Sequence, residues 1–215
     1  MKNKGFRNFQ VILLKLLTIS LIGCSSSDIE NDLVRNEIIY SREEQLENGK
    51  TVRWPLYQVS TPVTWQLLPI ENDLTDTTKP NATFLIDEGV TLSIHTFSYP
   101  GVEGHIPCER QIERWKGQLN KAAILVTPTS FCGFAGLYFE AENETTQVLG
   151  WSLQLDIRHR QKLFELAITP DQMAFFRQIT SDCTLKVKGA PVTINDHKEE
   201  ILSFANSLRL LHNLH

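Results

Sequence analysis

The sequence predicts an α+β domain in which a mostly antiparallel sheet is flanked by amphipathic helices. Consecutive strand-like segments are joined by short turns, and strands joined in this way pair antiparallel. One of them, Val148–Ile157, alternates apolar and polar residues as a half-buried strand does. Two segments far apart in the chain instead carry apolar residues at helical spacing. We therefore expect one globular domain over residues 50–215, with helices covering its sheet.

The first strands are expected on either side of an Asn-Gly turn. Asn48-Gly49 favours a type I′ hairpin between strands over Ile38–Glu47 and Lys50–Tyr57. The same stretch also allows a short helix, because Ser41 and Glu44 fit a capping box and a glycine closes the segment. The β-branched and aromatic residues that follow the turn favour the hairpin.

A second hairpin is predicted after a strand over Tyr57–Leu68 that breaks at Pro62, since proline cannot donate to a sheet ladder. Ala82–Asp87 and Val90–Phe97 flank a connection that ends in a glycine, which suits the left-handed position of such a turn. One face of the second strand of this hairpin carries Thr91, Ser93, His95 and Phe97.

The first helix is predicted over residues 108–120, after a loop rich in glycine and proline. Its apolar residues recur at steps of four, three and four, and this stripe comprises Cys108, Ile112, Trp115 and Leu119. A short strand over Ala122–Val126, a turn over Thr127–Cys132 around Pro128 and a strand over Gly133–Ala141 should follow.

The last third of the chain is expected to continue the sheet and end in a helix. Lys162–Ile168 is predicted as a strand and Thr169–Ile179 as a short capped helix. A strand over Asp182–Lys188 and a loop over Gly189–Ile194 precede the final helix, which Asp196 begins. The buried stripe of that helix comprises Ile201, Phe204, Ala205, Leu208 and Leu211.

The N-terminus has the order of a secretory signal. A positive segment precedes an apolar run over Val11–Ile22, which is shorter than the roughly 20 residues needed to span a bilayer. The run ends in Leu21-Ile22-Gly23-Cys24, which resembles the lipobox of bacterial lipoproteins, with Leu21 as the apolar position and Gly23 as the small one. An ordinary signal peptide with a chance cysteine is the alternative.

The lipobox resemblance implies a mature protein that begins at Cys24 and carries acyl chains there. Residues 1–23 would then be the signal peptide, and residues 24–49 a lipidated, polar tether. The resemblance further implies a lipid anchor in a bacterial membrane and a domain that faces the periplasm. Ser25 after the cysteine favours the outer membrane.

The charge balance limits the classes of partner. Four of the 21 basic residues precede Cys24, which leaves 17 basic and 25 acidic residues and a net charge of −8 in the mature part. This acidic excess argues against nucleic acid and against a surface held by anionic headgroups. Membrane attachment should therefore come from the acyl chains, several of which anchor a protein stably.

Few residues form a plausible chemical site, and no phosphate loop, HExxH or GxSxG motif occurs. His95, Glu103 and His105 are the residues that would hold zinc if their loop folded back over its strand. Cys132 and His95 would form the nucleophile–base pair of a hydrolase only if their side chains lay within hydrogen-bond reach of each other. No cofactor is expected.

Four tryptophans offer aromatic surface for binding. Trp115 and Trp151 lie at periodic positions and are expected in the core. Trp54 and Trp65 lie beside prolines near a predicted edge strand, and they are the candidates for an exposed binding surface.

The order of elements resembles the PsbP/Mog1-like fold, which DcrB-type bacterial lipoproteins share. The features in common are the turn Pro62-Val63-Thr64-Trp65, a hairpin followed by a helix with Trp115, and a C-terminal helix that ends in Phe204–Leu208. The resemblance covers roughly residues 50–212 and implies an antiparallel sheet between helices. More loosely, the chain is similar to small lipoproteins of unassigned function in chlamydia-like bacteria.

Members of this fold are mostly non-enzymatic accessory factors, so the resemblance implies a tethered protein that binds another envelope protein or a small ligand. No functional residue of the family matches this sequence. The alternative is a metal-binding or hydrolytic envelope protein that uses His95, Glu103 and His105.

Overall fold

The computed structural model describes residues 33–41, 44–45, 48–70, 79–97, 107–119, 123–155, 158, 165 and 182–211. The chain divides into two compact units, residues 1–35 and 36–215, and the fold below is that of the second. The signal segment, Cys24, Glu103 and His105 lie outside the described residues. So do the expected strand Lys162–Ile168, apart from Glu165, and the expected helix Thr169–Ile179.

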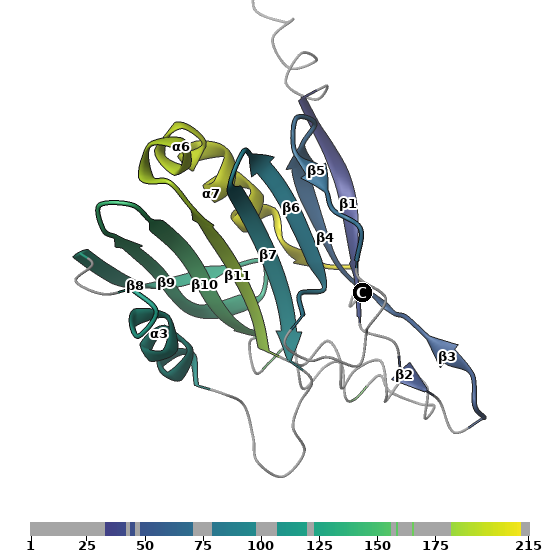
Figure 1. Cartoon of the computed structure of the whole chain (residues 1–215). Coiled ribbons are helices and arrows are strands. Elements are labelled where there is room, and N and C mark those ends of the chain that lie inside the picture. The colour runs from purple at the N-terminus through teal and green to yellow at the C-terminus, as the bar shows by residue number, and fades with distance from the viewer. Residues whose placement is uncertain are drawn as a thin grey trace, which may run out of the picture. The chain divides into compact units, whose positions relative to one another are not determined.

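Within the described residues, the main sheet has seven strands in the order β5-β6-β7-β11-β10-β9-β8, and each pairs antiparallel with its neighbours (Figure 1). The last of these strands in the chain, β11, lies between β7 and β10 and joins two groups of strands that are each consecutive in sequence. The strands are β5 (Gln66–Leu67), β6 (Ala82–Asp87), β7 (Val90–Phe97), β8 (Ala123–Phe131), β9 (Phe134–Glu142), β10 (Gln147–Leu155) and β11 (Asp182–Gly189).

The remaining strands form two smaller sheets. β1 (Val34–Tyr40), β4 (Pro55–Pro62) and β12 (Arg209–Leu210) lie in the order β1-β4-β12. β2 (Glu44–Gln45) and β3 (Thr51–Val52) form a two-stranded hairpin. Antiparallel strands with separate helices make the unit α+β, which confirms the predicted class.

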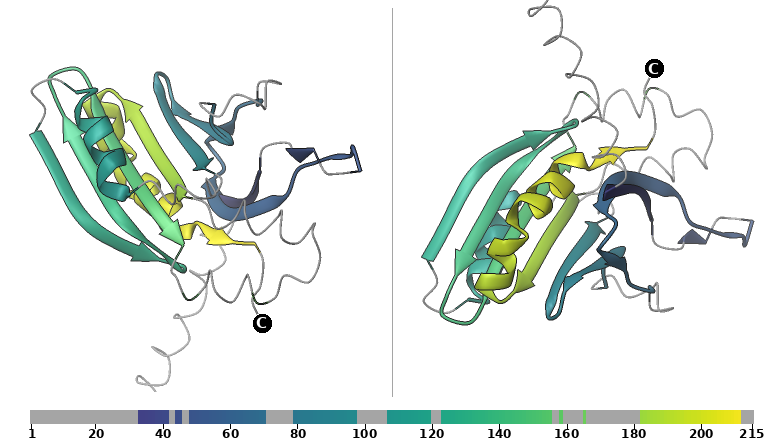
Figure 2. Two further views of the ribbon diagram at one scale, coloured as in Figure 1. Left: turned by 90° about the horizontal axis from the view of Figure 1, so that it is seen from below. Right: turned by 90° about the horizontal axis from the view of Figure 1, so that it is seen from above.

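Helices cover both faces of the main sheet, as Figure 2 shows. On one face, α3 (Cys108–Lys116) packs on β9 and β10, where the rings of Trp115 and Phe139 lie 5.7 Å apart. On the other face, α6 (Pro191–Asp196) leads into α7 (Lys198–Ser207), which contacts β4. Among the described residues, no helix is long and apolar enough to cross a bilayer.

The core has two parts because successive side chains of a strand point to opposite faces. Val148 of β10 packs with α3, whereas Leu149, Trp151 and Leu153 join the larger cluster on the α7 side. The strand is therefore covered on both faces, and not half-buried as its alternation predicts. Trp151 and Trp115 are 2% and 3% exposed, so both are buried as expected.

Several local predictions are confirmed. The hairpin β6–β7 has the predicted bounds, and Gly89 occupies the left-handed region with φ +72°. β2 and β3 do pair around Asn48-Gly49, where Gly49 has φ +79°. The turn is not the predicted type I′, because Asn48 has no positive φ and five residues separate Gln45 from Thr51, and the strands are shorter than the predicted Ile38–Glu47 and Lys50–Tyr57. Ser41 caps no helix; its hydroxyl accepts a hydrogen bond from the backbone N–H of Trp54 at 2.8 Å.

Other boundaries differ from the prediction. The tether was expected to reach residue 49, but Asn36–Tyr40 lie in strand β1 and Ile39 is 1% exposed. Of the turn expected over Thr127–Cys132, residues 127–131 are the second half of β8, because that strand lies at the end of the sheet order, where proline is tolerated. The loop expected over Gly189–Ile194 contains the start of α6, whose first residue is Pro191.

The cysteines of the described region are all thiols. Cys108 and Cys183 are buried, and Cys132 is exposed at the turn between β8 and β9. The Cys108 thiol lies at the start of α3 and donates to the carbonyl oxygen of Ser152 at 3.1 Å, which ties that helix to β10.

Candidate functional site

The expected tryptophan surface is not formed by Trp65. Its side chain is 1% exposed, and its ring lies 5.2 Å from that of Phe204 on α7. The turn that carries it closes with a hydrogen bond from the Trp65 N–H to the Pro62 carbonyl, which directs the indole into the core. Trp54 is half-buried and packs against the same core. The prediction that Trp65 marks a binding surface is therefore wrong.

Of the three residues of the predicted zinc site, the structure describes only His95, because Glu103 and His105 are outside the described residues. In the described ranges, no three His, Cys, Asp or Glu side chains come close enough to hold a metal ion. His95 lies on β7 and faces a cavity, with its ring stacked 6.3 Å from that of Phe97.

Cys132 and His95 lie in different parts of the fold. The Cys132 thiol is 3.7 Å from the carbonyl oxygen of Asn206 near the end of α7, whereas His95 shares its cavity with residues of α3. Since α7 and α3 cover opposite faces of the sheet, the nucleophile–base pair considered from the sequence is not assembled.

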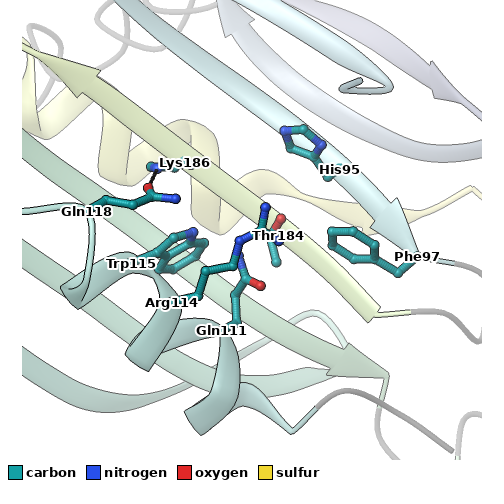
Figure 3. A pocket seen from close by; sticks show the side chains of 8 residues that line it. All are labelled: His95, Phe97, Gln111, Arg114, Trp115, Gln118, Thr184 and Lys186. Atoms are coloured by element: carbon teal, nitrogen blue, oxygen red, sulfur yellow. Dashed lines mark hydrogen bonds between the residues drawn. The ribbon is translucent and has the colours of Figure 1, made fainter. Parts of the chain in front are cut away.

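The structure instead brings together a group of polar and aromatic side chains beside α3. They line a cavity of about 240 Å³ between this helix and strands β7 and β11, here called the α3 pocket (Figure 3). Its described lining residues are Gln111, Arg114 and Trp115 of α3, Gln118 of the turn that follows this helix, His95 and Phe97 of β7, and Thr184 and Lys186 of β11.

Strand and helix periodicity explain why these side chains converge. His95 pairs with Thr184 across the β7–β11 ladder, and the residues two positions farther along each strand face the same side. Gln111 and Arg114 lie three residues apart on α3, and Gln118 follows four residues later in the turn after the helix, so the three side chains form a polar row. The apolar stripe of α3 packs on β9 and β10. The polar row lies beside this stripe and faces the neighbouring strands β7 and β11.

Two polar side chains form the buried floor of the pocket. Thr184 is 3% exposed and Gln111 is 8% exposed. Neither side chain has a hydrogen-bond partner in the part of the chain that the structure describes. Neither residue is among the side chains whose polar atoms are shut off from solvent without a partner, so these atoms are open to the cavity and available to a bound polar molecule.

The rim of the pocket is positively charged. Lys186 Nζ donates to Gln118 Oε1 at 2.6 Å and lies 6.0 Å from the centre of the Trp115 ring. Burial is the main reason that the pKa of Lys186 is lowered, and the positive charges of Lys188 and Arg114 lower it further. None of the lining residues that the structure describes is acidic.

Gly150 of β10 leaves room for the Trp115 side chain, which forms one wall of the pocket. A Cβ atom at this position would overlap the six-membered ring of Trp115. The absence of a side chain therefore lets the indole lie directly on the strand, and this contact sets the depth of α3 on the sheet.

A second polar cluster ties the turn between β6 and β7 to the start of α7. His197 Nδ1 is 3.0 Å from Glu200 Oε2, and its Nε2 is 3.4 Å from Asp87 Oδ2. The hydrogen bond with Glu200 is the main reason that the pKa of His197 is raised. The Trp65 indole N–H also donates to Glu200 at 3.3 Å. We interpret this cluster as structural, because it joins two elements and lies outside the α3 pocket.

Sequence reasoning identified one face of the pocket but not the pocket itself. The polar face of the strand that contains His95 and Phe97 was predicted. Arg114 and Lys186 were not singled out, since each is an ordinary surface cation in its own segment. The signal available in the sequence was the polar row on α3 beside its apolar stripe.

Comparisons with known proteins give no family. No protein-family model matches the chain, and no curated protein matches it. Among solved structures, it is similar to the PsbP protein of the cyanobacterium Synechocystis sp. PCC 6803 (CyanoP), with 11% identity and a TM-score of 0.43 over 89% of this chain and 99% of that one. It is also similar to LpqN of Mycobacterium tuberculosis, described as involved in cell envelope biogenesis, with 10% identity and a TM-score of 0.44 over 86% of this chain and 96% of that one.

Proposed function

We propose that this protein is a lipid-anchored protein of a bacterial envelope whose globular unit binds a small polar ligand in the α3 pocket without catalysing a reaction. The observation that carries the proposal is the floor of the pocket, where the polar atoms of Thr184 and Gln111 are open to the cavity and have no hydrogen-bond partner among the described residues. Side chains arranged in this way bind a polar molecule rather than fill a core.

The lipid anchor rests on the sequence around Cys24, and the periplasmic position follows from it. Several acyl chains would hold the protein at the outer membrane, with the domain extended from it by the residues that precede β1. In this arrangement the protein is an accessory factor that captures or presents its ligand beside the membrane, where a partner protein can receive it.

The absence of catalysis is supported by the placement of the reactive groups. Cys132 and His95 lie on opposite sides of the sheet, and His197 is engaged by two carboxylates at an interface between elements. Within the described ranges, the lining of the α3 pocket has no cysteine or serine, and we assign the hydroxyl of Thr184 and the amine of Lys186 to ligand binding.

Photo-crosslinking in intact cells tests the proposal. A photoactivatable amino acid replaces Gln118 at the rim of the pocket, and a matched variant carries it at Lys50, which is also exposed but lies in the β2–β3 hairpin. After irradiation, mass spectrometry of the purified protein should find a ligand adduct at position 118 and none at position 50. No adduct at 118, or equal adducts at both positions, would contradict binding in this pocket.

A further inference from the structure

Among the described residues that line the α3 pocket, no carboxylate offsets the positive charge. Arg114 has no ion-pair partner within the described part of the chain, and the side chain of Lys186 donates to the neutral amide of Gln118. By contrast, Lys198 forms an ion pair with a carboxylate, since its Nζ lies 2.7 Å from Glu140 Oε1. Two cations at one cavity of an otherwise acidic protein indicate a site for negative charge.

The floor of the pocket adds hydrogen-bond donors below these cations. Figure 3 shows Arg114 and Gln111 extending from α3 toward Thr184. The Thr184 hydroxyl can rotate to donate, and the Gln111 amide offers two N–H groups. The guanidinium of Arg114 presents paired donors whose spacing matches the two oxygens of a carboxylate or phosphate. Charged donors at the rim and neutral donors at the floor together suit an oxygen-rich anion.

The size of the cavity restricts the ligand further. Its volume of about 240 Å³ is below the range of roughly 300–1,000 Å³ that is usual for drug-sized ligands. A small molecule, or one end of a larger one, is therefore the occupant that fits. Phe97 and Trp115 form aromatic walls beside the donors, where a short apolar part of the ligand can pack.

From these contacts we infer that the ligand of the α3 pocket carries an oxyanion, either a carboxylate or a phosphate, held by Arg114 and Lys186 at the rim and by Thr184 and Gln111 at the floor. The inference rests on the proposed function and specifies its ligand class. A carboxylate and a phosphate share the required chemistry, so the choice between them is left to measurement.

Binding to the full mature protein in neutral detergent tests the inference. The probes are inorganic phosphate, glycerol phosphate and succinate, each titrated at constant ionic strength maintained with sodium chloride, with glycerol as the uncharged comparison. We expect at least one oxyanion probe to bind saturably and raise the melting temperature, and glycerol to have no effect. Preference for glycerol phosphate over inorganic phosphate would indicate a headgroup-like source, and preference for succinate would indicate a carboxylate.

Matched variants distinguish a built site from general attraction. Arg114→Gln and Lys186→Gln should each weaken probe binding by about tenfold or more, because each removes a charge-assisted hydrogen bond. Arg110→Gln removes the same charge one helical turn away, outside the lining, and should change binding less than about twofold. Thr184→Val keeps the shape of the floor and should weaken binding by several-fold while leaving the unliganded fold stable.

Equal losses from Arg114→Gln and Arg110→Gln would overturn the inference, because they would show a diffuse field rather than a site. Failure of all three oxyanions to bind more tightly than chloride would overturn it as well. If the position-118 adduct forms in cells while no oxyanion binds, the ligand class is wrong and the proposed function stands. If neither is observed, both are wrong.

Discussion

Gly150 is a position where a single added methyl group should disturb the pocket. In the Gly150→Ala variant, the new Cβ would overlap the Trp115 ring, so that α3 must lift from β10. Overpacking of this kind destabilises a protein by about 1–3 kcal/mol, and we expect that loss in the free energy of unfolding measured by denaturant titration.

Gly117→Ala is the matched control for this change. Gly117 has φ −63° at the end of α3, and its added Cβ would make only ordinary contacts at 3.6 and 3.7 Å. The control should be neutral or stabilise the protein by about 0.4–1 kcal/mol, since it restricts the unfolded chain. A similar loss of unfolding free energy in both variants would show that the packing of Trp115 does not require a glycine at position 150.

His197 gives the stability of the protein a defined pH dependence. Its pKa in the folded state is raised above the ordinary 6.5, first by the hydrogen bond with Glu200 and also by Asp87. The pKa of Asp87 is lowered from 3.8, mainly by the N–H of Glu88 and then by His197. Protonated His197 therefore stabilises the folded state fully below pH 6.5, and this contribution is lost as the pH rises through the folded pKa.

The pH window follows from both shifts, because the contribution of ionised Asp87 is present above pH 3.8 and is lost as the pH falls through its folded pKa. Melting temperatures of the wild type and of His197→Gln should differ most near pH 5 and converge at alkaline pH, once His197 is deprotonated in the folded state as well. A difference of the same size at both pH values would mean that His197 acts by packing and not by charge.

At the scale of the element, β10 should tolerate a charge least of all the strands. Trp151 is buried between the sheet and the α7 side of the core, with its ring 5.1 Å from that of Tyr138. Trp151→Asp removes a large aromatic side chain, which costs about 3–5 kcal/mol, and buries an unpaired carboxylate in addition. We expect the circular dichroism spectrum of the variant to be that of an unfolded chain.

The same substitution on the edge strand is the control. Ile124 of β8 is 45% exposed, so Ile124→Asp should cost less than about 1 kcal/mol and leave the melting transition in place. A cooperative melt of Trp151→Asp close to that of the wild type would refute the central position of β10.

Local sequence signals predicted the elements well where one face is apolar and the turn has a glycine. Ala82–Asp87 and Val90–Phe97 satisfy both conditions and were predicted with the observed bounds. Pro128 suggested a turn because proline breaks an inner strand, and only the strand order shows that β8 is at the edge. The central place of β11 was not predictable either, since strand order depends on contacts between residues far apart in the chain.

The candidate site was less predictable than the fold for the same reason. Its residues come from three elements, and none of them has an unusual pattern around it. Trp65 was expected on the surface because it follows Pro62 near an edge. The turn directs its ring inward, where Phe204 completes its packing. Such contacts between distant segments decide burial, and they are visible only once the chain is folded.

At the scale of the whole molecule, the proposed lipid anchor has the most direct test. Cys24→Ser should abolish incorporation of labelled fatty acid and release the protein from the membrane fraction, because no acyl chain can then be attached. Cys132→Ser is the control, since this exposed cysteine belongs to the folded unit and should not affect labelling. Labelling that persists in Cys24→Ser would exclude the lipobox interpretation.

The position of β11 has a consequence for the order in which the chain can fold. The hairpin β6–β7 and the meander β8–β9–β10 can each form as soon as their residues are synthesised, because their contacts are local. The two groups have no shared ladder until Asp182–Gly189 inserts between β7 and β10. Closing the sheet is thus a late, long-range step that waits for the last strand. For the export that we propose, this delay would keep the sheet open until Asp182–Gly189 has been synthesised.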